Sequence, residues 1–262
     1  MTGAGAVVAL VLLEWTTGWM GAAAWTQSWA VVRRGHFRVL AWGAVVLAVL
    51  GVLAAASAIS GDDSGAVVFL GMVLIALCAG YRVVQQSRTD RPGAVVGAAA
   101  AATGFVTLVV GGVLLDNWTP LVAGIQLVAG AALLGAVTNG MLLGHWYLNQ
   151  PGLKPWALAR LTTLSLAALA VSLGLGLAFA FRLSSASTEG AAFGLEIFGD
   201  SFGFAFYIVW LALMGLTAAV VWMARRCVRI RSIQSATGLY YVALLTVGVA
   251  EFLVRYLMVN AS

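Results

Sequence analysis

The sequence predicts an all-α, polytopic membrane protein with eight transmembrane helices and both termini outside. Hydrophobic residues make up 62% of the 262 residues and charged residues only 9%, whereas a soluble domain is about 45–50% apolar and about 25% charged. The apolar runs last about 20 residues, which suits a membrane-spanning helix, while strands of membrane barrels alternate over about 10. The loops between the runs also alternate in the sign of their charge.

This composition excludes several classes of protein. A soluble enzyme, a nucleic-acid-binding protein or a disordered chain could not accommodate so much apolar surface, because folded proteins leave much of their surface in water. The net charge of +5 therefore reports the loops of a membrane protein and indicates no nucleic-acid partner. We expect one integral membrane bundle over residues 1–262, in contact with lipid.

Eight apolar segments define the expected spans. All four prolines lie at their junctions, where a missing N–H and a fixed φ are tolerated and a new helix can begin. The chain has no Lys or Arg before Arg33, so the first span is expected to be a retained helix rather than a signal peptide. The spans cover approximately residues 5–31, 38–59, 65–85, 94–115, 119–147, 156–181, 203–224 and 237–259.

The loop charges orient the bundle. Arg33, Arg34 and Arg38 follow the first span, Asp62 and Asp63 follow the second, and the alternation continues to the last loop. The positive-inside rule then places the basic loops in the cytoplasm and both termini outside, in a cell inner (plasma) membrane. The longest loop, 183–202, is expected outside as an interfacial helix, a docking surface or a plain connector.

Glycine pairs predict close helix contacts inside the bundle. Gly93 and Gly97 are four residues apart, as are Gly140 and Gly144. Small residues at this spacing lie on one helix face and let another backbone approach. No internal repeat is evident in the sequence.

Three ionisable residues lie within the apolar spans. Glu14 is in the first span, and Glu251 and Arg255 are one turn apart in the last. Ionisable groups in hydrocarbon are costly and are functional candidates by default. Glu251 and Arg255 share one helix face and can neutralise each other. If the first and last spans pack together, Arg255 can pair with both carboxylates. The group would then be either a polar clamp between helices or a site for a proton or a quinone headgroup. If the spans do not pack together, Glu14 should be protonated or should line a polar cavity.

A second cluster is expected at the inner edge of the membrane. The fifth span ends with Asn139, His145, Trp146 and Tyr147, which we interpret as interfacial residues and candidate headgroup or quinone contacts. His36, in the sequence RRGHFR, is read as a loop residue beside lipid phosphates. Because His36 and His145 are the two histidines of the chain, a b-type cytochrome with bis-histidine haem ligation is an alternative.

Cysteine usage indicates no covalently bound cofactor. Cys78 lies in an apolar run and Cys227 in a basic loop, and neither forms a CxxC or CxxCH motif. The sequence thus offers no ligands for an iron–sulfur cluster, a structural zinc or a covalent haem.

The last span, with Glu251, Arg255 and Tyr256 near its end, resembles the last helix of the quinone-linked membrane anchors of dimethyl-sulfoxide reductase and polysulfide reductase type oxidoreductases. The number of spans and the position of Glu14 are similar as well. The resemblance implies an anchor that binds a catalytic or iron–sulfur subunit and exchanges electrons and protons with quinone. The His-Leu-Gly stretch and the Ser-Trp-Leu-Ser-type loop of those anchors have no counterpart here.

Two further functions stay open. The buried carboxylates could serve a small-solute or proton-coupled transporter, although every proline lies at a junction and none breaks a helix at the midplane. The polar clusters could also only pack helices, as in a structural or assembly subunit without its own chemistry. A free-standing membrane enzyme is disfavoured because no Ser/His/Asp set, phosphate-binding glycine loop or metal-spaced carboxylates occur.

Overall fold

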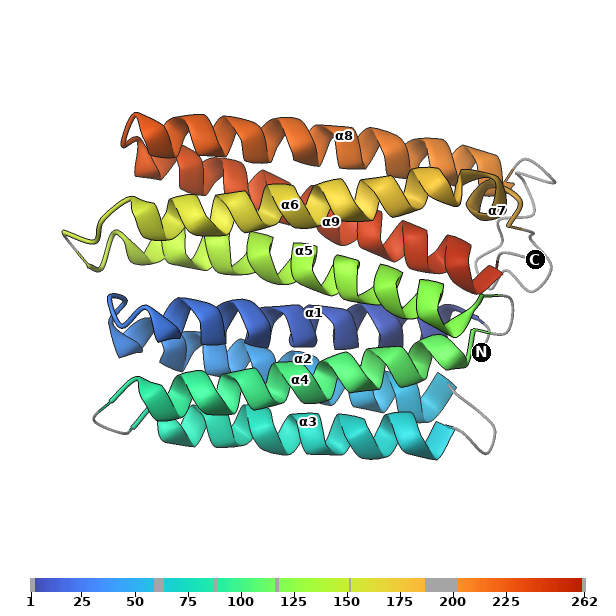
Figure 1. The fold of residues 1–262 in the computed structure, drawn as a ribbon, viewed down its shortest axis with the longest axis horizontal. Helices are drawn as coiled ribbons and strands as arrows, with labels where there is room; N and C mark the ends of the chain where they lie inside the picture. The colour runs from blue at the N-terminus through green and yellow to red at the C-terminus, as the bar shows by residue number, and fades with distance from the viewer. Residues whose placement is uncertain are drawn as a thin grey trace.

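A computed structural model of the chain describes residues 3–58, 64–86, 89–115, 118–150, 152–186 and 202–260 (Figure 1). Within these ranges eight helices are long and apolar enough to cross a membrane, which confirms the predicted fold class. A short helix, α7 (Ala180–Ser184), follows the sixth span. The eight long helices are α1 (Ala4–Ser28), α2 (Arg34–Ala58), α3 (Ser64–Val84), α4 (Arg91–Val113), α5 (Pro120–Trp146), α6 (Trp156–Ala178), α8 (Phe202–Arg229) and α9 (Ile233–Asn260).

Several helices extend beyond the predicted boundaries at their arginine-rich ends. Helix α2 begins at Arg34 instead of at 38. Helix α8 ends at Arg229 instead of at 224, and α9 begins at Ile233 instead of at 237. Arginine is a good helix former, and its long side chain carries the charge to water while the backbone stays helical. The chain then reverses at Arg231, whose φ of 61° is left-handed.

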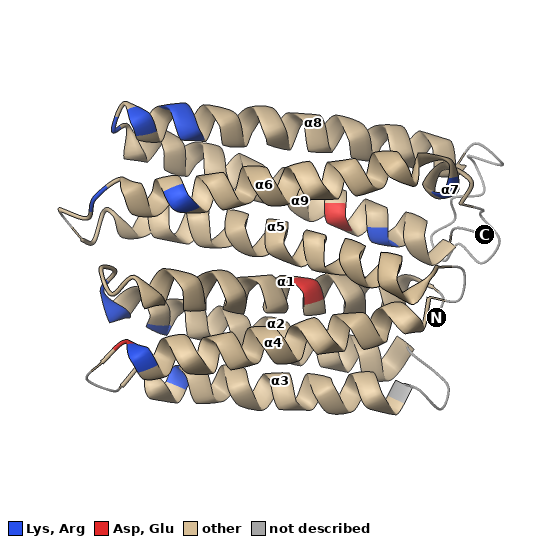
Figure 2. Cartoon of the chain, in the orientation of Figure 1, with Lys and Arg blue, Asp and Glu red and all other residues tan. Residues whose placement is uncertain are grey.

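Basic residues gather at one end of the bundle, and both chain ends lie at the other (Figure 2). Among the described residues, Arg182 is the basic residue near the chain ends, and Arg255 lies inside the bundle. Eight crossings bring both termini to one end, as the sequence predicts. The segment 187–201 and, apart from Asp90, the acidic residues of the loops lie outside the described residues.

The two halves of the chain are built alike. In the first half, α1 contacts α2 and α4, and α3 contacts α2 and α4. In the second half, α5 contacts α6 and α9, and α8 contacts α6 and α9. The halves lie side by side, and their first helices, α1 and α5, meet at the centre and run in the same direction (Figure 1). The same pattern of helix contacts thus occurs in both halves, and we call this shared pattern the internal repeat. It is not evident in the sequence.

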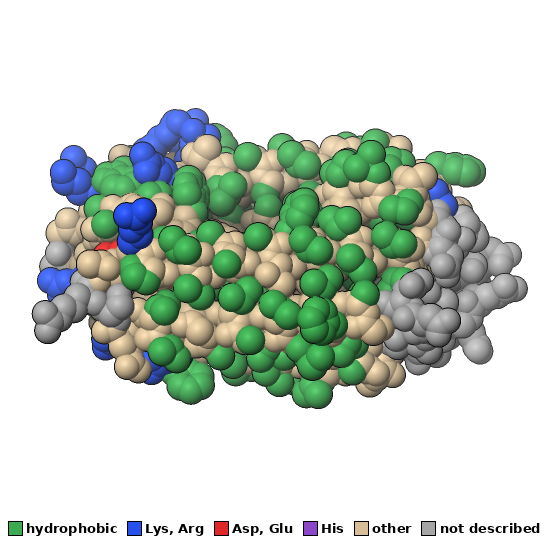
Figure 3. Space-filling view, turned by 60° about the horizontal axis from the view of Figure 1, so that its bottom comes forward, with side chains coloured by type: hydrophobic (Ala, Val, Ile, Leu, Met, Phe, Trp, Pro, Cys, Tyr) green, Lys and Arg blue, Asp and Glu red, His purple; other side chains and the backbone are tan. Residues whose placement is uncertain are grey.

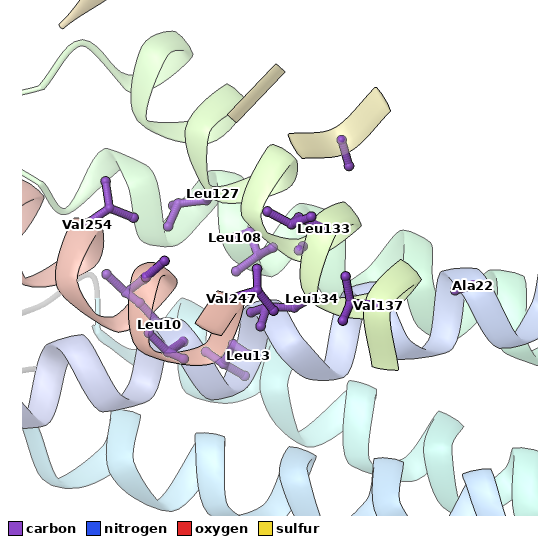
Figure 4. Packing of buried hydrophobic residues seen from close by; sticks show 14 of the residues in the cluster. Leu10, Leu13, Ala22, Leu108, Leu127, Leu133, Leu134, Val137, Val247 and Val254 are labelled. Carbon is purple, nitrogen blue, oxygen red and sulfur yellow. The ribbon is translucent and has the colours of Figure 1, made fainter. Parts of the chain in front are cut away.

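The contact between α1 and α5 depends on glycine. A Cβ atom added at Gly18 would meet the backbone of Ala131, and one added at Gly135 would meet the backbone of Gly18. In a membrane, helix association rests on close packing rather than on the hydrophobic effect, so small residues are needed where backbones touch. Buried Leu and Val side chains of α1, α4, α5 and α9 fill the space around this crossing (Figure 4).

The outer surface of the helices is apolar. Leu53 is 61% and Leu245 70% exposed. Hydrophobic side chains cover the long face of the molecule, while most Lys and Arg lie near one end (Figure 3). The apolar long face suits contact with lipid acyl chains, and the basic end suits contact with lipid headgroups.

Replacing Gly135 with leucine should separate the two halves. The new side chain would clash with the backbone of α1, and overpacking of this kind costs about 1–3 kcal/mol. We expect the melting temperature of the purified protein in detergent to fall by several degrees. The matched control is Gly215→Leu on α8, where an added Cβ meets no atom within 4 Å. Equal melting temperatures for the two variants would contradict the proposed role of Gly135.

Candidate functional site

Arg255 pairs with two buried carboxylates. Its Nε atom lies 2.6 Å from Oε1 of Glu14 on α1, and its Nη2 atom lies 2.9 Å from Oε2 of Glu251 on its own helix, α9. Glu14 and Glu251 are fully buried and Arg255 is 1% exposed. The first and last spans do pack together, so the structure shows the arrangement in which one arginine serves both carboxylates. We call these three residues the ionic triad.

Two other helices complete the surroundings of the ionic triad. Arg255 Nη2 also donates to the backbone oxygen of Gln126 on α5 at 2.9 Å, and Ser172 Oγ on α6 donates to Oε1 of Glu251 at 3.4 Å. Gly130 on α5 makes room for the charges, because a Cβ there would contact both Arg255 and Glu251. The triad therefore joins α1 of the first half to α5, α6 and α9 of the second.

The charges of the ionic triad do not balance when both carboxylates are ionised. Two carboxylates and one guanidinium carry a net charge of −1, and among the described residues the three form ion pairs only with one another. An uncompensated charge in a buried apolar site is strongly unfavourable, whereas one added proton makes the group neutral. Oε2 of Glu14 has no hydrogen-bond partner in the described chain and can hold this proton. The chemistry available is reversible proton binding.

His145 and Tyr147 line a cleft at the basic end of the bundle. It lies between the end of α5 and the start of α9, has a volume of about 480 Å³, and includes Gln234, Thr237 and Tyr241 of α9. None of the described side chains that line it is Asp, Glu, Lys or Arg. The lining therefore offers neutral hydrogen-bonding groups and aromatic rings. We call it the neutral cleft.

The other predicted inner-edge residues lie elsewhere. Asn139 is buried between the two halves, where its Nδ2 donates to the backbone oxygens of Trp19 and Gly135. Trp146 donates from Nε1 to Oε1 of Gln150 at 3.1 Å, inside the loop after α5. The structure thus brings His145 and Tyr147 together in one cleft and leaves Asn139 and Trp146 out of it.

The interpretation of His36 as a loop residue is wrong. His36 lies in the first turn of α2 and is only 2% exposed. Its ring packs against Phe37 and Trp146, with centroid distances of 5.1 and 5.7 Å. The sequence reading failed because α2 begins at Arg34, which turns the imidazole toward the bundle instead of toward lipid phosphates.

The structure places the two histidines in different surroundings. Haem b ligation of the bis-histidine type needs two imidazoles that face each other across a gap. His36 is packed against Trp146 between α2 and α5, while His145 is exposed in the neutral cleft beside α9. The described residues also contain no group of three or more His, Cys, Asp or Glu suited to a metal ion.

A buried amide cluster escaped the sequence analysis. Gln27 of α1 donates from Nε2 to Oε1 of Gln85 at 2.8 Å and accepts a hydrogen bond from Tyr81 Oη at 2.9 Å. All three side chains are at most 1% exposed. Gly93 leaves room for Gln27, because a Cβ there would overlap the amide. Uncharged amides near a helix end carry little signal in a sequence, although the Gly93 and Gly97 pair points to this contact.

A second cleft at the basic end adjoins Gln27 and has a volume of about 490 Å³. It lies between the end of α1 and the start of α4. The neutral cleft lies at the corresponding place in the second half, between the end of α5 and the start of α9. Because Asp90 and Arg91 line it, we call it the charged cleft.

Apart from Thr89 in the charged cleft and Leu148 in the neutral cleft, the residues that line the two clefts have the same spacings. From the first helix of each half, the charged cleft takes Gln27, Ser28 and Ala30 and the neutral cleft takes Gly144, His145 and Tyr147. The last helix of each half supplies the opposite wall. In the charged cleft these residues are Asp90, which precedes α4, and Arg91, Ala94, Val95 and Ala98. In the neutral cleft they are Ile233, Gln234, Thr237, Gly238 and Tyr241. The internal repeat therefore includes this pair of clefts.

The fold defines a polytopic α-helical membrane protein with an internal repeat, an ionic triad where the halves meet, and two clefts at the basic end. No known protein-family model, curated protein or solved structure matches the chain.

Loss of Arg255 should destabilise the protein far more than loss of Glu14. Arg255→Met leaves two buried carboxylates without a cation, and breaking a buried pair in this way costs about 3–5 kcal/mol. Glu14→Gln leaves one neutral pair, Glu251 and Arg255, and should change stability little. Thermal unfolding in detergent measures both effects. A Glu14→Gln variant as unstable as Arg255→Met would contradict the charge balance described above.

Proposed function

We propose that this protein is the membrane anchor subunit of a multi-subunit respiratory oxidoreductase that exchanges electrons and protons with quinone. The ionic triad is the observation that carries the proposal. It holds a removable proton in a buried site, and conversion between quinone and quinol takes up or releases two protons with two electrons. The resemblance of the last span to the quinone-linked anchors supports the same role.

The neutral cleft is the proposed site of the quinone headgroup. Quinone oxygens accept hydrogen bonds, and His145, Gln234 and Tyr241 offer donors in a cleft of suitable polarity at the end of the membrane. Tyr241 precedes Glu251 by ten residues on α9, which corresponds to about 15 Å along the helix. Next to Tyr241, the hydroxyl of Tyr240 donates a buried hydrogen bond to Thr162 on α6. Thr246, between Tyr241 and Glu251, shares a buried hydrogen bond with Thr217 on α8. These groups support a connection between the headgroup site and the ionic triad.

The redox centre would belong to a partner subunit. The sequence provides no cluster ligands, and a partner containing iron–sulfur or a catalytic metal would take the electrons of quinol. This chain would supply the membrane anchor, the quinone site and the proton-binding group. The proposal therefore requires a stable complex in the native membrane.

Purification from native membranes in a mild detergent tests the proposal. We expect a partner that carries iron and acid-labile sulfide, and a quinone analogue should raise the melting temperature of the complex. His145 would contact the headgroup. His145→Ala should therefore raise the analogue concentration needed for half-maximal stabilisation about tenfold. The control is Ser28→Ala, at the corresponding position of the charged cleft. Purification without a redox partner, together with no response to the analogue, would rule the proposal out.

A Glu14→Gln variant of the same complex tests the role of Glu14 in proton transfer separately from quinone binding. Glu14→Gln removes the proton-binding oxygen, so quinol-linked turnover should fall at least about tenfold. The analogue should still stabilise this variant, because Glu14 is far from the neutral cleft. Full turnover in Glu14→Gln would show that the ionic triad only packs helices, as in a structural subunit.

A proton-coupled transporter is the second candidate function, and the internal repeat favours it. Many transporters consist of two related halves, with the coupling site where the halves meet. Glu14 belongs to the first half, and Glu251 and Arg255 to the second. Proton-coupled solute uptake in proteoliposomes that Glu14→Gln abolishes, with no redox partner bound, would favour this function over the anchor.

We also propose that the basic end faces the cytoplasm of the cell and that both termini lie outside. The basic residues at one end and the chain ends at the other support this orientation under the positive-inside rule (Figure 2).

Maleimide labelling of Cys227, a native cysteine, tests this orientation. It is partly exposed near the basic end, whereas Cys78 is fully buried. A membrane-impermeant maleimide should label the protein in right-side-out vesicles only after permeabilisation. A Cys227→Ser variant serves as the control for labelling at Cys78. Labelling of Cys227 in sealed right-side-out vesicles would reverse the proposed orientation.

A further inference from the structure

The charged cleft has a polar end and an apolar end. Its polar end, where α1 ends and α4 begins, is lined by Ser28, Asp90 and Arg91. Its apolar end is lined by Ala94 and Val95, which lie farther along α4 toward the middle of the membrane. Val95 is 60% exposed on the outer face of the helix. This gradient matches an amphiphile that keeps its headgroup at the interface and its chain along the helix.

The charges of the cleft favour an anion. Asp90 is already neutralised, because its Oδ1 lies 3.1 Å from Nε of Arg34. Arg91 is exposed and forms no ion pair with any described residue. The cleft therefore keeps one uncompensated positive charge. Arginine suits a phosphate group because its planar guanidinium donates two parallel hydrogen bonds.

The inner wall of the cleft is a fixed polar surface. Gln27 is 1% exposed and is held by Gln85 and Tyr81. Its Nε2 group donates one hydrogen to Gln85 and carries a second hydrogen that can donate to another acceptor. A buried amide and an unpaired arginine thus line the same space from two helices.

We propose that the charged cleft binds the phosphate headgroup of an anionic glycerophospholipid. Basic pockets between transmembrane helices on the cytoplasmic side bind such headgroups. Free phosphate shares the anionic chemistry, but it would leave the apolar part of the cleft uncovered, so a lipid is the ligand that fits the whole site. The neutral cleft, with the same spacing of residues, lacks a charged side chain among its described lining residues and would not share this preference.

Lipid titration of the delipidated protein tests this assignment. The probes are phosphatidylglycerol, phosphatidylcholine and inorganic phosphate, and the readout is the melting temperature in a neutral detergent. Phosphatidylglycerol should stabilise the protein at lower concentration than phosphatidylcholine. Arg91→Gln should raise the phosphatidylglycerol concentration for half-maximal stabilisation about tenfold, the effect of losing one charge-assisted hydrogen bond. Asp90→Asn, which frees Arg34 as a second cation, should lower it.

The matched control is Arg229→Gln, which removes an exposed arginine at the same end but outside the cleft. It should respond to phosphatidylglycerol like the unmodified protein. An unchanged response in Arg91→Gln, or an equal loss in Arg229→Gln, would overturn the proposal by showing general attraction to the basic end. Stabilisation by inorganic phosphate alone would overturn the lipid assignment. Arg91 and Asp90 lie at the surface, so both variants should fold.

Discussion

The pairing of Arg255 with two carboxylates fixes how the helices of this protein meet. Glu14 lies on the first helix and Glu251 on the last, so one guanidinium connects the two halves of the chain. In apolar surroundings a carboxylate that loses its partner is strongly destabilising, and α1 and α9 therefore cannot separate or rotate without a large penalty. The same pairing leaves one carboxylate in excess, so one added proton would make the group neutral.

Glycine positions decide where polar side chains can be buried. Gly130 admits the ionic triad beside α5, Gly93 admits the amide of Gln27, and Gly140 admits the ring of Tyr240. Lipid does not drive helices together by the hydrophobic effect, so close approach and buried hydrogen bonds must hold the bundle. A small residue on one helix and a polar residue on its neighbour provide both at one place, and this combination recurs in each half of the chain.

The internal repeat shows how one scaffold supports two chemistries. Both halves place a cleft between their first and last helices at the basic end, with residues at the same spacing. One carries Asp90 and Arg91, and the other carries His145, Gln234 and Tyr241. The two clefts therefore differ in charge while they occupy corresponding places in the two halves.

The sequence by itself determined the class of protein, the eight spans and the three buried ionisable residues, because hydropathy and charge are local properties that the membrane selects residue by residue. Only the tertiary structure decided that Arg255 reaches Glu14, that His36 is buried against Trp146, and that the chain repeats itself. Those features depend on which helix faces meet. Such contacts join residues far apart in the chain through packing of small side chains, which one-dimensional patterns of apolar residues do not encode.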